Sequence, residues 1–170
     1  NTSASEAELL ERLKGARSIG FGVFPTGGNP KQSKLLGLAF AFERHAATYL
    51  PLKQPASELP QIPSEVRKRL ESGELEVTGH DLKNALAILK WHGVTVKAKL
   101  FDVMIAHSLI EPDMRHSLGY LSEAYLGYTP TSVAKISGEE SILLAQLAPD
   151  KVVNLAGEEV DVSLRLRQVF

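Results

Sequence analysis

Three β-strand patterns follow one another near the start of the chain, and the links between them are short. Residues 18–24, 34–42 and 45–52 are each rich in apolar side chains, and turn residues separate the first two. Links of this length leave no room for the crossover that parallel neighbours need, so they favour antiparallel pairing. The sequence therefore predicts a three-stranded antiparallel meander.

The rest of the chain alternates between helix and strand patterns. Ser64 and Asp81 are expected to cap helices with their side chains, and the basic run Arg67-Lys68-Arg69 is expected to face water. Further strands are expected over 75–79 and 94–100, and helices over 6–14, 64–70, 82–92, 103–110 and 117–126, from Ser137 onward and from Pro149 onward. This order predicts an α/β domain with a mixed sheet flanked by helices.

Length, charge and composition exclude several classes of protein. The chain has 170 residues, enough for one domain, and its formal net charge of −1 argues against binding nucleic acid by charge alone. It contains no cysteine, which excludes disulfides, thiolate metal sites and cysteine nucleophiles. No signal peptide or bilayer-spanning apolar run is evident, so a cytoplasmic location without membrane contact is expected.

Local motifs do not assign a chemistry. The sequence has no phosphate-binding loop, dinucleotide fingerprint or nucleophile elbow, and its five histidines never fall at HxxxH spacing. Composition and spacing alone therefore leave an α/β domain of unknown purpose.

Four segments together carry a family resemblance. They are LLGLAFA at 35–41 with the strand that follows, GHDLKNALAIL at 79–89, PDMRHSL at 112–118 and AGEEVDVSL at 156–164. With compatible spacing over essentially the whole chain, they resemble the 3′→5′ proofreading exonuclease domain of bacterial DNA polymerase I. The resemblance implies a ribonuclease H-like fold, with a mixed sheet of about five strands whose first three are antiparallel. It also implies that residues 1–170 are a single exonuclease-like domain excised from a longer polymerase chain.

The same resemblance identifies where catalytic carboxylates would stand. Active members hold two divalent metals with an Asp-x-Glu pair on the first strand, an aspartate on a following helix and a Tyr-x-x-x-Asp on the last helix. Here these positions fall on Gly22 and Phe24, on Ala85, and on Leu155 with Glu159. Only Glu159 is acidic, so we expect no catalytic residue, no metal and no cofactor in this domain. Phe24 is expected to leave the former cleft filled or apolar.

The leading hypothesis is a catalytically inactive exonuclease-like domain that supports the polymerase domain of the same parent chain. By resemblance, that parent is a DNA-directed DNA polymerase, a nucleotidyltransferase of replication and repair that holds the DNA primer-template. The isolated domain is expected to be monomeric.

Three alternatives remain open. The first is an active, Mg²⁺-dependent exonuclease with relocated ligands such as Asp81, Glu159 and His80. The second is a module that binds single-stranded DNA without cleaving it, with His80, Asp81 and Lys83 as candidate contacts. The third is a self-standing interaction protein of the same fold.

Overall fold

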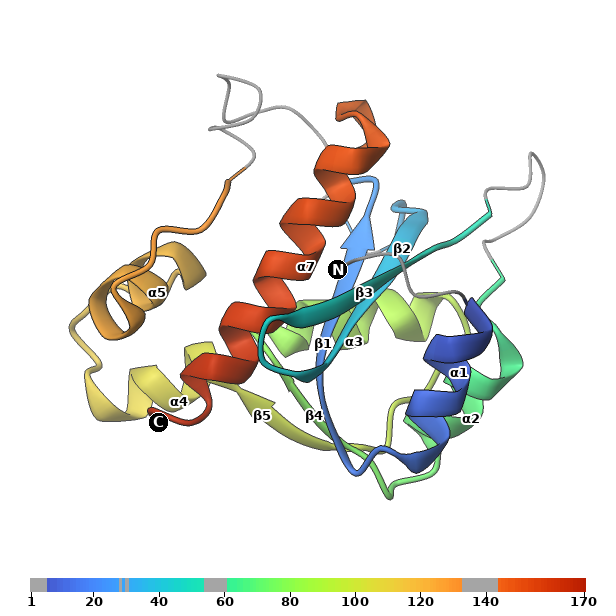
Figure 1. Ribbon diagram of the computed structural model, residues 1–170, viewed down its shortest axis with the longest axis horizontal. Coiled ribbons are helices and arrows are strands. Elements are labelled where there is room, and N and C mark those ends of the chain that lie inside the picture. The colour runs from blue at the N-terminus through green and yellow to red at the C-terminus, as the bar shows by residue number, and fades with distance from the viewer. Residues whose placement is uncertain (1–5, 28, 30, 54–60, 133–143) are drawn as a thin grey trace.

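The computed structural model describes residues 6–27, 29, 31–53, 61–132 and 144–170 as one mixed sheet with helices on both faces (Figure 1). The strands are β1 (Ser18–Pro25), β2 (Leu35–Glu43), β3 (Ala46–Pro51), β4 (Glu76–Gly79) and β5 (Lys99–Asp102). The helices are α1 (Glu6–Gly15), α2 (Ser64–Glu71), α3 (Leu82–Trp91), α4 (Val103–Ile110), α5 (Leu118–Leu126), the short 3₁₀ helix η1 (Leu144–Gln146) and α7 (Pro149–Leu166).

The sheet confirms the predicted antiparallel meander. Its five strands run in the order β3-β2-β1-β4-β5, and β1 pairs antiparallel with β2, as β2 does with β3. β4 pairs parallel with β1, and β5 parallel with β4. The parallel pairs are possible because α2 and α3 supply the crossovers that the short links of the meander cannot. In the strand order β3-β2-β1-β4-β5, β1 is the central strand.

The alternation of side chains along the strands divides the core between the two faces. Ile19 and Phe21 of β1 pack with α1, α2 and α3 on one face. Phe24 of β1 and Ala39 of β2 pack with α7 on the other. Side chains two residues apart share a strand face, so the positions of Gly22 and Phe24 both belong to the side covered by α7.

Helix α7 lies very close to β1, where the strand lacks side chains. A Cβ built on Gly20 would lie 2.8 Å from the backbone oxygen of Val160 and 3.1 Å from the Cβ of Ala41. Glycine at this position thus allows the helix backbone to approach the sheet. The contact fixes the helix turn that carries Glu159.

Among the helices that the structure describes, none has both the length and the apolar character needed to cross a membrane.

Several expectations about local structure are wrong. The predicted strand at 94–100 is instead β5 at Lys99–Asp102, because strand pairing with β4 begins only at Lys99. Ser64 does not cap α2: Pro63 occupies the N-cap position without a side-chain bond, and the Ser64 hydroxyl donates to Glu65. Ser137, where a further helix is expected, lies outside the described residues, so that expectation stays a prediction.

The basic run of α2 does not lie wholly in water. Lys68 is exposed, but Arg67 and Arg69 are half-buried. The guanidinium of Arg69 donates to the backbone oxygens of Leu13 and Ala16, at the end of α1. Arg69 therefore joins α2 to α1, and it is not the solvated cation that the sequence predicted.

Candidate functional site

A cavity of about 210 Å³ lies where β1, the start of α3, α5 and α7 meet. It brings together five positions singled out in the sequence. They are Gly22, His80, Asp81, Ala85 and Glu159. The remaining lining comes from Phe21, Val23, Leu82, Asn84 and Leu118. Residues far apart in the chain thus meet at one place, as the family resemblance implies.

Phe24 lies outside the cavity lining and does not fill the cavity. Its side chain is buried in the core beneath α7, with its ring centroid 6.1 Å from that of Tyr49. A Cβ built on Gly22 would lie 2.8 Å from Cε2 of Phe24 and 2.9 Å from Cγ1 of Val160. The ring therefore takes the space that a side chain at position 22 would need. The expectation of a filled or apolar cleft is wrong, because the ring packs into the core and polar groups still line the cavity.

Asp81 occupies the N-cap position of α3 without capping the helix, contrary to the sequence prediction. Its backbone is left-handed, with φ 52° and ψ 49°, and its side chain makes no capping hydrogen bond. The carboxylate of Asp102 accepts instead from the backbone N–H groups of Asp81 at 3.3 Å and Leu82 at 2.7 Å. Aspartate is one of the few residues that tolerate this backbone region. The Asp81 side chain is thereby left to line the cavity.

Asp102 caps two helices at once. Besides the start of α3, it caps α4 by accepting from the backbone N–H groups of Met104 at 2.9 Å and Ile105 at 3.4 Å. Its role at α3 could not be found from the sequence, since no local spacing relates Asp102 to residues 81 and 82. The pairing of β4 with β5 sets Gly79 opposite Asp102 and brings the two helix starts together.

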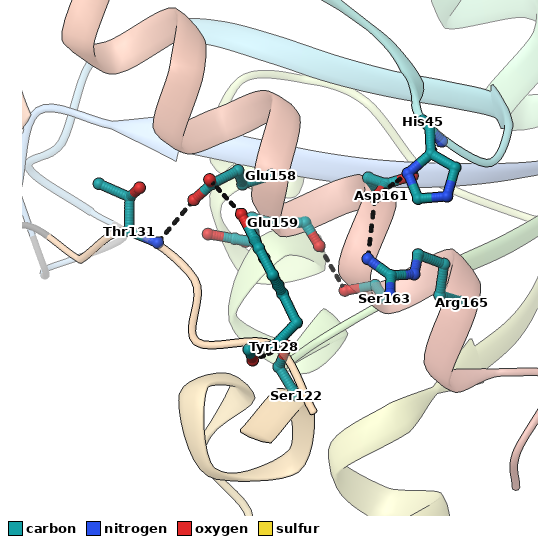
Figure 2. Close-up of polar contacts among 9 residues, drawn as sticks. All are labelled: His45, Ser122, Tyr128, Thr131, Glu158, Glu159, Asp161, Ser163 and Arg165. Atoms are coloured by element: carbon teal, nitrogen blue, oxygen red, sulfur yellow. Dashed lines mark hydrogen bonds and ion pairs between the residues drawn. The ribbon is translucent and has the colours of Figure 1, made fainter. Parts of the chain in front are cut away.

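Glu159 carries a strongly perturbed carboxyl group. Burial, and secondly the negative charge of Asp81, raise the pKa of Glu159 from 4.5 to about 7. The residue is half-buried by its accessible surface. Its one drawn contact in Figure 2 is the hydrogen bond in which the Ser163 hydroxyl donates to its backbone oxygen. Near neutral pH the Glu159 carboxyl is therefore partly protonated.

The neighbouring glutamate of α7 is held by a different set of contacts. Glu158 accepts from the hydroxyl of Tyr128 at 2.5 Å and from the backbone N–H of Thr131 at 2.6 Å (Figure 2). The hydrogen bond raises the pKa of Tyr128. These contacts attach the segment after α5 to α7 beside a second hollow of about 400 Å³, which Leu155 and Glu159 both line. Residues 155 and 159 thus share a helix face, as their spacing predicts.

Of the three candidate nucleic-acid contacts, His80 and Asp81 line the cavity and Lys83 does not. His80 lines the cavity, and its Nε2 lies 2.7 Å from the backbone oxygen of His116, to which it donates. Lys83 instead lines a separate groove between α3 and α4. Among the described residues, the cavity lining includes acidic side chains and no lysine or arginine.

The residues present do not fit a pair of divalent cations. Two such ions need several carboxylates that converge on them, and Mg²⁺ also demands near-octahedral oxygen ligation. Of the described residues, Asp81 and Glu159 are the acidic ones that line the cavity, and the positions on β1 and α3 hold Gly22 and Ala85. Within the described ranges, no three His, Asp or Glu side chains lie close enough to hold a metal ion. The arrangement supplies one carboxyl group that exchanges a proton near pH 7.

The sheet order, the meander and the long helix across its face define a ribonuclease H-like exonuclease fold. The chain belongs to the 3′→5′ exonuclease domain family of family A DNA polymerases, since the family profile described as "3'-5' exonuclease" matches residues 1–170.

Individual relatives place this domain within longer proteins. The chain is 25% identical over 166 residues to DNA polymerase I of Borreliella burgdorferi, a match that covers 96% of this chain and 18% of that protein. A solved structure described as the apo form of a nuclease gives a TM-score of 0.76 at 22% identity, covering 96% of this chain and 75% of the other. A solved structure of the polymerase domain of Pol1 from M. smegmatis, in complex with DNA primer-template and dNTP, gives a TM-score of 0.65 at 19% identity. The match covers 95% of this chain and 25% of the other. The chain thus spans about a fifth of its curated relative.

Proposed function

We propose that this chain is a catalytically inactive 3′→5′ exonuclease-like domain that supports the polymerase domain of a DNA polymerase I. The observation that carries the proposal is the contact of Phe24 with Gly22. The positions of the family's first two carboxylates hold a residue without a side chain and a ring that takes its space.

The energetics support the same conclusion. Phosphodiester hydrolysis needs its barrier lowered by on the order of 20 kcal/mol. In a two-metal site the paired ions contribute by stabilising both the attacking and the leaving oxygen. The cavity offers Asp81 and Glu159, and burial holds the Glu159 carboxyl partly protonated near neutral pH. A protonated carboxyl is a poor ligand for a hard cation.

A nuclease assay tests the proposal. The substrate is end-labelled single-stranded DNA, incubated with the purified chain in Mg²⁺ or in Mn²⁺, and the Glu159→Ala variant serves as the matched control. We expect the same background nucleotide release from both proteins. Metal-dependent release that disappears in Glu159→Ala would contradict the proposal.

One observation favours a second candidate, an active nuclease with relocated ligands. Asp81 and Glu159 line the same cavity, and His80 lies beside them. Titration calorimetry with Mn²⁺ separates the two candidates. The inactive domain gives no micromolar isotherm, whereas a relocated site binds the ion and loses it in the Asp81→Asn variant. Asparagine is the suitable replacement because it also tolerates the left-handed backbone at position 81.

A further inference from the structure

Helix α4 carries a buried histidine whose two ring nitrogens are both engaged. His107 is only 1% exposed. Its Nδ1 lies 2.7 Å from Nδ1 of His116, in the segment between α4 and α5, and its Nε2 lies 3.0 Å from the hydroxyl of Tyr125 in α5. The rings of His116, Tyr125 and Phe170 surround it, with centroid distances of 4.9, 5.3 and 5.4 Å. His107 therefore joins α4 to both the connecting segment and α5, which lie side by side in Figure 1.

The contact between the two Nδ1 atoms has room for one proton. A neutral imidazole has one N–H and one acceptor nitrogen, whereas an imidazolium has two N–H groups and no acceptor. When both rings are neutral, one donates and the other accepts. When one ring is charged, the neutral ring still supplies the acceptor. When both are charged, two N–H donors face each other at 2.7 Å, so the hydrogen bond between His107 and His116 is lost.

The surroundings of this pair do not neutralise two positive charges. Among the described residues, the histidine that forms an ion pair is His45, with Asp161, so neither His107 nor His116 has a carboxylate partner. The titratable and charged groups around the pair are the phenols of Tyr120 and Tyr125, the imidazole of His80, the exposed side chains of Glu111, Asp113 and Arg115, and Arg167 after α7, which lies over the Phe101 ring. Two imidazolium rings with centroids 4.9 Å apart would therefore repel each other.

His116 is the ring that is able to move away. His107 is enclosed by aromatic rings, whereas His116 is half-buried in a segment that forms neither helix nor strand. Its movement would reach the candidate site, because its backbone oxygen accepts from His80, and Leu118 lines both the cavity and the neighbouring hollow. Leu121 is buried against α7 and would keep α5 in place. The change would thus be confined to the connecting segment and the adjacent cavity wall.

We propose that His107 and His116 form a proton-operated latch, which holds residues 111–117 against α4 while at least one ring is neutral and releases them when both are charged. Histidine changes its charge between about pH 5 and pH 8, and the first charge on the pair opposes the second. Release is therefore expected at the acidic end of this range. It opens the cavity wall at Leu118 and gives solvent access to Glu159. The latch does not depend on whether the domain cleaves DNA.

Single spin labels test the latch, because the chain contains no cysteine of its own. Met114→Cys places a label on the connecting segment, and Leu109→Cys places a reference label on α4; both side chains are exposed. Electron paramagnetic resonance spectra are recorded at pH 7.5, 6.0 and 5.0 in buffers that contain EDTA, and ring nitrogen NMR shifts report the charge of both histidines. We expect the mobile fraction of the label at position 114 to rise by roughly threefold or more between pH 7.5 and pH 5.0. The label at position 109 should not change.

Two variants of His116 separate the latch from a general effect of acid. The amide of His116→Asn can donate to Nδ1 of His107 or accept from it and carries no charge, so the segment should stay held at all three pH values. His116→Ala removes the contact, so the segment should be mobile throughout. The matched control is His45→Asn, at an exposed histidine whose left-handed backbone asparagine tolerates. It should behave as wild type.

A label at position 114 that stays immobile down to pH 5.0 would overturn the proposal. So would an acid-induced release that persists in His116→Asn. A simultaneous gain of mobility at position 109 would also overturn it, because it would indicate unfolding of α4 instead of release of the segment. The nuclease assay is separate: metal-dependent cleavage refutes inactivity and leaves these spectra unchanged.

Discussion

Replacing Glu159 with glutamine should make the protein more stable at alkaline pH and leave it almost unchanged at acidic pH. Burial and Asp81 raise the pKa of the folded-state carboxyl from 4.5 to about 7. Between these values the unfolded chain releases the proton while the folded chain keeps it. Ionisation therefore favours the unfolded state, and the stability of the wild type falls as pH rises from about 4.5 to about 7.

The magnitude follows from the size of the shift. A pKa difference of about 2.5 corresponds to about 3 kcal/mol at 1.36 kcal/mol per pH unit. This value is an upper limit, since the side chain is half-buried and solvent screens part of the charge. Glu159→Gln removes the titrating group. The free energy of unfolding of the variant should therefore exceed that of wild type by nearly zero at pH 4 and by at most about 3 kcal/mol at pH 8. The melting temperature at pH 8 should then rise by up to roughly 10 °C for a domain of this size.

Urea unfolding of both proteins across pH 4 to 8 measures the difference, and a carboxyl carbon NMR titration reads the Glu159 pKa directly. Glu123→Gln is the matched control, because Glu123 is an exposed glutamate that lines the neighbouring hollow. Its stability should follow that of wild type at every pH. A stability difference for Glu159→Gln that does not change with pH, or a variant that is less stable at pH 8, would refute the electrostatic argument.

Further substitutions test the packing around the site by thermal and urea unfolding. Asp102→Ala should lower the free energy of unfolding by about 2 to 4 kcal/mol, because one carboxylate caps both α3 and α4 and each cap contributes about 1 to 2 kcal/mol. A loss below about 1 kcal/mol would contradict the stabilising role of the double cap. Gly22→Asp should destabilise by about 1 to 3 kcal/mol through the clash with the Phe24 ring. Adding Phe24→Ala relieves this clash but removes a buried ring, so the double variant should lose less than the sum of the two single losses. Tyr128→Phe should lower the free energy of unfolding by about 1 kcal/mol, because it removes the hydrogen bond to Glu158. Glu158→Gln keeps an acceptor oxygen and should lower the free energy of unfolding by less.

Local sequence patterns were sufficient for most of the fold. Alternating side chains and short links predicted the meander, and Pro149 marked the start of α7 correctly. The strand expected at 94–100 was misplaced because an alternating pattern states only that a segment can form a strand. Hydrogen bonding to β4 determines which residues form the strand, and the residues that pair with β4 are Lys99–Asp102. For the site, the structure places Gly22, Ala85 and Glu159 around one cavity, whereas Phe24 and Leu155, which the resemblance implies at the same site, lie outside its lining.

The sequence by itself determined the strand order of the meander and the helix starts, since these depend on neighbours a few residues apart. Only the tertiary structure decided that Phe24 turns into the core, that Asp102 and not Asp81 caps α3, and that Glu159 titrates near pH 7. Each of these depends on burial or on a hydrogen bond between segments distant in the chain. Desolvation and charge interaction act through space, and a linear pattern does not record which distant groups share that space.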